Sequence, residues 1–258
     1  MISALPFRAD ERPPAVFRPL KAFGHFRKLV DNKEDTAQVF YMGECLPSRR
    51  FKAAAKRFCE SDPGKSLMDS QADLPDILDD HDMLGSLPAG SVAHAYVAFM
   101  RKEGLSAAGL VEASQLPGVQ SYPDKLQWLS DRLRDTHDMA HVLTGYGRDA
   151  LGEQCVLGFT SAQYHDWTEW FIAWAGALEL VTKVKSDAPV FAAIAEARRH
   201  GRAAAALYRQ DIRALLAEPL DLARKRLGIE EPIQYRRAHA RYRAKGLDPY
   251  RLFAAQPA

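Results

Sequence analysis

From Leu20 onward, apolar residues recur at intervals of three and four along almost the whole chain, which is the period of an amphipathic helix. One such set consists of Phe23, Phe26, Leu29 and Val30, which share one helical face. We find no alternating segment of useful length and no internal repeat, so strands and repeat architectures are not expected. The periodicity predicts an all-α fold, a single bundle-like domain of roughly eight helices.

Local signals place the ends of two predicted helices. Residues 87–91 have the composition of a helix start, and Gly104 is positioned to end the helix that follows. Residues 121–124 contain a capping residue and an early proline, so another helix is expected to begin there. Gly145 and Gly147 should end it.

Two further long helices are expected in the second half of the chain. One runs from about Asp149 toward residue 185, and the next begins near Asp187, is interrupted at Pro219 and ends at Gly228. Residues 62–87 are acidic and begin with an Asp-Pro-Gly sequence, which predicts a loop-like stretch.

The distribution of prolines and charges divides the chain into three parts. Residues 1–19 contain four prolines and are expected to form an extended tail. Residues 20–235 form the predicted helical domain, and residues 236–258 a basic C-terminal tail. From residue 190 to the end there are 14 lysines and arginines against 7 acids. Such a surface suits anionic lipid, nucleic acid or an acidic partner, and it equally suits a solvated helix face.

Composition excludes several classes of protein. A net charge of +2, with 47% hydrophobic and 26% charged residues, is typical of a globular domain and not of a disordered chain. The overall charge is near neutral and argues for no particular partner, and a nucleic-acid partner is not expected. Three cysteines without paired spacing predict reduced thiols. We find no apolar run long enough to span a bilayer, no signal peptide and no transit peptide.

The sharpest local signal is the sequence His137-Asp138-Met139-Ala140-His141. At about 100° per residue, His141 lies about 40° and Asp138 about 100° around a helix from His137, so the three can face one cleft. Two imidazoles one turn apart are the spacing of helical metal sites. Glu153 follows beyond the Gly145–Gly147 turn and can face the pair from the next helix. These four residues predict a metal site between two adjacent helices.

The ligand set bears on the choice of metal. Two imidazoles with carboxylates and no thiolate suit Zn, Mn, Fe or Co. Asp138 is either a ligand or an outer residue that orients a histidine ring. Histidines at this spacing also occur by chance on surfaces, and His81-Asp82 shows a pair with no second histidine one turn on.

Two other clusters are candidates for substrate binding. Trp167, Trp170 and Trp174 share a helical stripe, which is either core, the wall of an apolar tunnel or a membrane-facing strip. Arg199 and Arg202 belong to a basic cluster that is either a solvated face or a clamp for carboxylate or phosphate. We find no glycine-rich phosphate loop and no serine-nucleophile motif.

The chain resembles the Coq-four family of ubiquinone (coenzyme Q) biosynthesis proteins. That family carries HDxxH, then eleven residues, then glutamate, usually as Gly-Glu, and here Gly152-Glu153 follows His141 at that spacing. Residues 87–99, 200–203 and 224–232 also resemble family segments, so the similarity covers roughly 20 to 235. The chain departs from the family at Asp211-Ile212, where a Trp-Glu pair is common, and at residues 156–159, where Trp-Phe-Glu is usual.

The resemblance implies a divalent metal, usually zinc, bound by His137, Asp138, His141 and Glu153. It implies action at carbon 1 of a polyprenylated 4-hydroxybenzoate-type lipid, with removal of the carboxylate alone or coupled to hydroxylation. It also implies partners among the other ubiquinone biosynthesis proteins and peripheral attachment to the membrane. Without a transit peptide, a bacterial member at the inner face of the cytoplasmic membrane is expected.

Two alternatives are weighed against this decarboxylase. The first is a non-enzymatic lipid-binding scaffold, in which the metal ties two helices together while the protein gathers partners. The second is a phosphohydrolase with an HD pair, which would need a further upstream histidine and downstream aspartate and fits poorly. A homo-oligomer is left open by the sequence.

Overall fold

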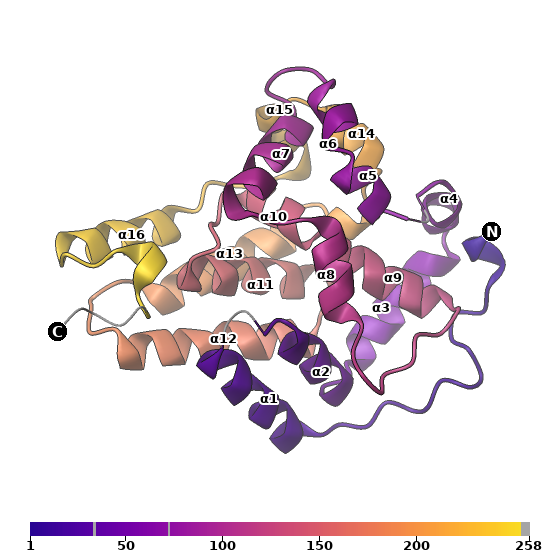
Figure 1. Cartoon of the computed structure of the whole chain (residues 1–258), viewed down its shortest axis with the longest axis horizontal. Helices are drawn as coiled ribbons and strands as arrows, with labels where there is room; N and C mark the ends of the chain where they lie inside the picture. Colours follow the sequence, from indigo (N-terminus) through magenta and orange to yellow (C-terminus); the bar gives the residue numbers. More distant parts are fainter. Residues whose placement is uncertain (33–34, 72, 254–258) are drawn as a thin grey trace.

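The computed structural model of the protein describes residues 1–32, 35–71 and 73–253. Over these ranges the chain forms sixteen α-helices, three short 3-10 helices and no strand, which confirms the predicted all-α fold (Figure 1). An isolated bridge between Ser91 and Pro219 is the nearest approach to sheet structure in the described part.

The described helices are distributed over both halves of the chain. The first half contains η1 (Ile2–Ala4), α1 (Pro19–Asp31), α2 (Ala37–Cys45), α3 (Arg49–Glu60), α4 (Asp62–Ser70), α5 (Pro75–Asp79), α6 (His81–Gly85), α7 (Val92–Glu103) and α8 (Ala107–Ser114). The second half contains α9 (Lys125–Asp135), α10 (His137–Thr144), α11 (Ala150–Tyr164), α12 (Trp167–Lys183), α13 (Val190–Ala203), η2 (Leu207–Arg209), α14 (Ile212–Ala217), α15 (Leu220–Leu227), α16 (Ile233–Ala244) and η3 (Pro249–Arg251).

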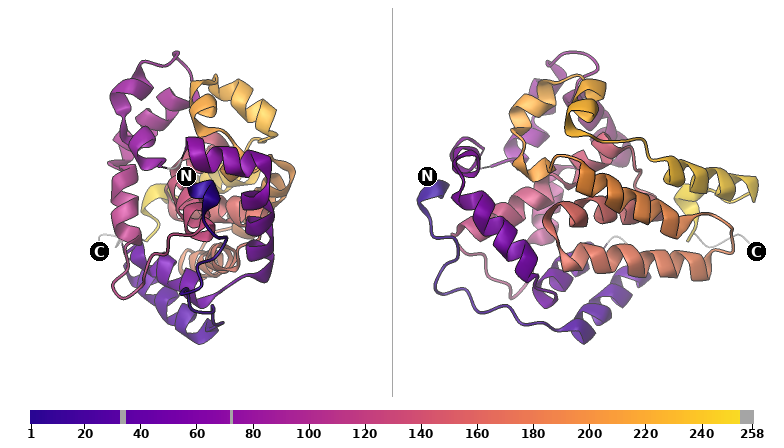
Figure 2. Two further views of the ribbon diagram at one scale, coloured as in Figure 1. Left: turned by 90° about the vertical axis from the view of Figure 1, so that its right-hand side faces the viewer. Right: turned by 180° about the vertical axis from the view of Figure 1, so that it is seen from behind.

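Helix α11 is the centre of the arrangement. It packs against α12 and α13, and the three run side by side when the molecule is seen from behind (Figure 2). Helices α1 and α2 pack together below α12 in Figure 1, and α2 contacts α12. Helices α7 and α15 contact α10 on the opposite side of the molecule.

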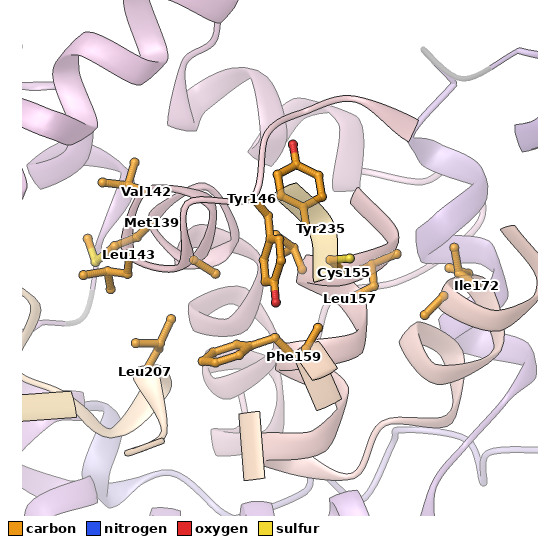
Figure 3. Packing of buried hydrophobic residues seen from close by; sticks show 14 of the residues in the cluster. Met139, Val142, Leu143, Tyr146, Cys155, Leu157, Phe159, Ile172, Leu207 and Tyr235 are labelled. Atoms are coloured by element: carbon orange, nitrogen blue, oxygen red, sulfur yellow. The ribbon is translucent and has the colours of Figure 1, made fainter. Parts of the chain in front are cut away.

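The contact between α11 and α13 depends on a glycine. A Cβ atom at Gly201 would lie only 2.1 Å from the carbonyl oxygen of Phe159, so the two backbones approach too closely for any side chain there. This approach buries Phe159 completely, together with Cys155 one turn earlier in α11. Figure 3 shows both among the apolar side chains of α10 and α11 that form the core.

The structure corrects the predicted number of helices. Several predicted long helices are pairs of shorter ones, because a capping residue or a left-handed residue interrupts the backbone while the apolar period continues. The helix expected from Asp149 to residue 185 divides at His165, whose φ of 62° ends α11, and Asp166 then caps α12. The helix expected from residue 121 divides at Thr136 into α9 and α10.

Other expectations about local structure were wrong. The helix predicted from Asp187 ends at Ala203, well before Pro219, and the interval holds η2 and α14. Residues 62–87, predicted as a loop, contain α4, α5 and α6. Ser61 caps α4 and Asp80 caps α6, and α4 and α5 each have a proline in the first turn. Capping residues and prolines also occur in loops, so they do not distinguish a short helix from a loop. The predicted ends at Gly104, Gly145 and Gly228 are confirmed.

The predicted tails are partly ordered helix. Residues 2–4 form η1, and Pro19 already belongs to α1. The boundary expected after residue 235 falls inside α16, whose Tyr235, His239 and Tyr242 are buried, so this basic segment is a packed helix. Residues 254–258 of the predicted tail lie outside the described residues. Among the described helices, none combines the length and hydrophobicity needed to cross a membrane.

We predict that Gly201→Ala lowers the free energy of unfolding by about 1 to 3 kcal/mol, because α11 and α13 must separate to admit the methyl group. Urea denaturation would measure the change. Gly43→Ala is the matched control, since nothing lies within 4 Å of the added atom and helix propensity favours alanine by up to about 1 kcal/mol. Equal stability of the two variants would contradict the close approach.

Candidate metal centre

Three of the predicted ligand residues converge where α10 meets α11. His137 and His141 lie one turn apart on α10, and their Nε2 atoms are 3.3 Å apart. Glu153, in the first turn of α11, places Oε2 3.4 Å from Nε2 of His141 and 3.6 Å from Nε2 of His137. The glycine turn after α10 therefore folds α11 back as the sequence predicted.

These separations fit a metal ion. Four ligand atoms placed about 2.0 to 2.1 Å from a tetrahedral zinc lie about 3.3 to 3.4 Å from one another. The two imidazole nitrogens and the carboxylate oxygen have nearly that spacing. The donor set also fits, because Zn accepts imidazole nitrogen and carboxylate oxygen together.

Asp138 lies beside this group but less closely. It is buried, and one of its oxygens is within 4.8 Å of the ligand atoms of both His137 and His141. That distance is compatible with a fourth ligand after a small side-chain rotation or with an outer position. The predicted alternatives for Asp138 therefore both remain.

The hydrogen bond of His141 selects the ring tautomer that suits a metal ligand. Its Nδ1 lies 3.1 Å from the carbonyl oxygen of Tyr146, an acceptor that requires the proton on Nδ1. Nε2 then keeps its lone pair toward the cluster, as in other histidine-metal sites. The ring also stacks on Phe99, with centroids 5.5 Å apart, which limits its rotation.

The charges around Glu153 favour its ionised form. Burial opposes that charge, but the charges of His141 and His137 and their hydrogen bonds hold the pKa of Glu153 well below its ordinary value. Conversely, although burial opposes it, the hydrogen bond and charge of Glu153 raise the pKa of His137 to about 9. Arg148 adds a cation, with Nε 3.4 Å from Oε1 of Glu153.

The turn that positions Glu153 is fixed by Asp149. Its carboxylate caps α11, accepting from the amides of Leu151 and Gly152 at 3.2 Å. The same carboxylate accepts a hydrogen bond from the Tyr235 hydroxyl and lies 3.0 Å from Nε2 of His239. Tyr235 and His239 both come from α16, and His239 belongs to the segment predicted as a tail, so part of that segment supports the candidate centre.

The end of α10 is held in a similar way by α15. The guanidinium of Arg224 donates to the carbonyl oxygens of Leu143 and Val142, at 2.9 and 3.1 Å. These carbonyls lie in the last turn of α10, where they lack helical partners. Figure 3 shows Tyr146 and Tyr235 beside each other at this turn, and their rings meet edge to face at 5.3 Å.

A large cavity opens from the candidate centre. Its volume is about 2090 Å³, and His137, Asp138 and Glu153 line it together with Arg148. Away from the ligands, apolar side chains of α1, α2, α11 and α12 form much of its wall, including Phe26, Leu29, Val30, Val39, Leu157 and Ile172. The cavity is thus polar at the candidate centre and largely apolar along the α1–α2 side.

Comparison with known families identifies the chain. Residues 20–233 match the model of the family described as "Coenzyme Q (ubiquinone) biosynthesis protein Coq4". The chain belongs to the Coq4 family. The match covers most of the chain, which confirms the resemblance seen in the sequence and makes this a ubiquinone biosynthesis protein.

A solved structure has the same fold. It is a candidate ubiquinone biosynthesis protein from Nostoc punctiforme, with a TM-score of 0.59 and 19% sequence identity. The alignment covers 83% of this chain and 100% of the Nostoc chain. At this identity the likeness concerns the fold alone. A comparison with curated proteins found no match.

The residues predicted to bind substrate do not line this cavity. Trp167 and Trp170 are 51% and 37% exposed, and the half-buried Trp174 stacks on Phe191 instead. The cavity side of α12 is formed by other residues, including Thr168, Glu169, Ile172, Gly176 and Glu179. A stripe at helical spacing does not reveal which side of the helix faces the interior.

The predicted arginine clamp is also outside the cavity. Arg199 is exposed and lies 3.9 Å from Glu196 of its own helix, and Arg202 is exposed as well. Both are on α13, which does not contribute to the cavity wall. A cation beside the ligands is Arg148, which the sequence analysis missed although it directly follows the predicted turn, five residues before Glu153.

We predict that Tyr235→Phe weakens binding of Zn²⁺ or Co²⁺ by up to about tenfold, because Tyr235 holds the Asp149 carboxylate that fixes the start of α11 and thereby the position of Glu153. Competition with a chromophoric chelator would measure the affinity. Tyr242→Phe is the control, because it removes a buried hydroxyl from the same helix without touching Asp149. A loss of stability in Tyr235→Phe with unchanged metal affinity would show a purely structural role.

Proposed function

We propose that this Coq4-family protein removes the carboxylate from carbon 1 of a polyprenylated 4-hydroxybenzoate-type acid, in a metal-dependent reaction. The observation that carries the proposal is one cavity that joins the candidate ligands to a long apolar wall. A lipid with a small acidic head and an isoprenoid tail matches both regions.

The proposed metal ligands are His137, His141 and Glu153, with Asp138, which lies within 4.8 Å of both histidines, as a fourth ligand or an outer residue. Zinc is the first choice, and Mn, Fe and Co suit the same donors. Cys45, Cys59 and Cys155 are buried outside this group, so no thiolate is involved. A bound divalent ion would withdraw electrons from the carboxylate or phenol oxygens of the substrate.

The charge balance of the site favours an anion. The carboxylates of Asp138 and Glu153 neutralise two positive charges, so a divalent ion together with Arg148 leaves a net positive charge at the candidate centre. A substrate carboxylate would compensate it. The guanidinium of Arg148 has the planar donor arrangement that carboxylates prefer, and we propose that it holds the acid beside the ligands.

The outer face of α12 supports peripheral attachment to a membrane. Trp167, Trp170, Leu178 and Val181 are exposed and follow one stripe of the helix, while the opposite face lines the cavity. Tryptophan is favoured at the lipid interface because its ring is apolar and its N–H is polar. For a bacterial protein, we propose attachment on the cytoplasmic side, where the isoprenoid substrate is reached.

The same exposed stripe also favours a second function. A non-enzymatic scaffold would use it to bind lipid or other ubiquinone biosynthesis proteins, and the metal would only tie α10 to α11. Turnover by the purified protein separates the two functions, because a scaffold converts no substrate.

We predict that metal-loaded protein converts a short-chain 3-prenyl-4-hydroxybenzoate with loss of CO2, and that His141→Ala does not. Mass spectrometry of products formed with and without oxygen would measure the loss and reveal any added hydroxyl group. Absence of turnover with metal still bound and lipid still retained would favour the scaffold.

We predict that the double variant Trp167→Ala and Trp170→Ala binds anionic vesicles at least about tenfold more weakly, because two apolar ring systems leave the interface. Cosedimentation with vesicles would measure the binding. Leu222→Ala is the control, since Leu222 is 60% exposed but lies on α15, at the far end of the molecule from α12 (Figure 1). Equal binding by both variants would place the attachment elsewhere.

A further inference from the structure

A second polar cluster lies in the same cavity, outside the candidate ligands. Glu169 of α12 accepts a hydrogen bond from the hydroxyl of Thr160 at 2.6 Å and another from the hydroxyl of Tyr164. Both donors belong to α11. Helix α11 therefore holds both oxygens of the Glu169 carboxylate, and both Glu169 and Tyr164 line the cavity.

No lysine or arginine pairs with this carboxylate within the described part of the chain. The charged groups that act on Glu169 are Asp166, which repels it, and His137, which attracts it from the candidate centre. Burial and Asp166 together raise the pKa of Glu169 to about 7. By contrast, Glu179 lines the same cavity from the same helix and pairs with Lys183 at 2.5 Å.

The cluster stands at a defined place relative to the candidate ligands. Glu153 and Thr160 are seven residues apart on α11, so they share one helical face about 10 Å apart along the axis. Tyr164 continues the same face one turn further on. A ligand held at Glu153 and extending along α11 would thus approach Glu169 next.

We propose that Glu169, oriented by Thr160 and Tyr164, recognises the phenolic hydroxyl of the substrate and accepts its proton during the reaction. This inference rests on the proposed function, because it takes the substrate acid to be held at the candidate metal centre. In a 4-hydroxybenzoate the hydroxyl is on the opposite side of the ring from the carboxylate. Its O–H therefore projects away from Arg148 and toward Glu169.

Hydrogen-bonding capacity supports this assignment. A carboxylate offers about four lone-pair positions, and Thr160 and Tyr164 occupy two of them. The remaining positions need a donor, and an uncompensated carboxylate is costly to leave without one. A phenolic hydroxyl supplies the donor, whereas an ether or a bare ring does not.

The proton transfer has a chemical purpose at carbon 1. The phenolic O–H bond breaks, its proton forms a new O–H bond on Glu169, and the electron pair stays on the ring oxygen. That pair is delocalised to the para carbon, which bears the carboxylate and takes a proton from solvent as CO2 leaves. Glu169 then returns its proton to the oxygen, so the net change is loss of CO2 and gain of one solvent proton.

The test compares three acids on the metal-loaded full chain. They are 3-farnesyl-4-hydroxybenzoate, its 4-methoxy ether and 3-farnesylbenzoate, which lacks the hydroxyl. We expect wild type to bind the hydroxy acid at least about tenfold more tightly than either analogue by calorimetry, because a hydrogen bond to a charged group is lost. Glu169→Gln should reduce this preference to about twofold or less and lower kcat for the hydroxy acid by about a hundredfold or more, with unchanged metal content.

Glu60→Gln is the control, because it removes an exposed carboxylate of α3 outside the cavity wall, and it should keep both the preference and kcat. If Glu169→Gln does not fold, Glu169→Asp decides the question, because the shorter carboxylate retracts from the ligand and should lower the preference. Equal binding of all three acids by wild type, or an unchanged preference in the Glu169 variants, would overturn the inference and leave the proposed function standing. Failure of metal-loaded wild type to bind any of the acids would overturn both.

Discussion

The candidate centre depends on the buried carboxylate of Asp149. Some of its hydrogen bonds are local in sequence, since Asp149 caps the first turn of α11. Its other partners are distant in sequence, because Tyr235 and His239 of α16 contact the same carboxylate. Helix α11 therefore begins at a fixed place and angle relative to α10, and Glu153 faces the two histidines. Without the partners from α16, the cap would still start a helix but would not orient it.

The arrangement of the cavity wall follows from the packing of α11. Close approach to α13 at Gly201 buries one side of α11, and the core around Cys155 and Phe159 buries more of it. The face that carries Glu153, Leu157 and Tyr164 lines the cavity. Glu153, the apolar Leu157 and the two hydroxyl donors of the polar cluster thus lie on successive turns of α11. This arrangement matches an elongated amphipathic substrate, which presents its acid, ring and tail to different parts of one wall.

Helix α12 divides its two faces between different environments. Its inner face brings Glu169 and Ile172 to the cavity, and its outer face presents Trp167 and Trp170 to the surroundings. The tryptophans were the more conspicuous residues in the sequence, yet the cavity is lined by their less conspicuous neighbours. The spacing of apolar residues shows that a helix has an apolar stripe along one side. The neighbours of the helix decide whether that stripe faces inward, and here α11 takes the opposite side.

The sequence by itself determined the helical fold and several helix ends, and it predicted the four residues of the candidate centre. These follow from interactions within a few residues, namely the helical period, the left-handed glycines at 104, 145 and 228, and a histidine pair one turn apart with a glutamate beyond a short turn. Breaks at Thr136 and His165 escaped prediction because the apolar period passes through them unchanged. Only the tertiary structure decided that Arg148 and Glu169 enter the cavity, that Arg199 and Arg202 do not, and that α16 supports Asp149. The physical reason is that these roles depend on which helix faces which across the bundle, and contacts between segments far apart in the chain leave no local pattern.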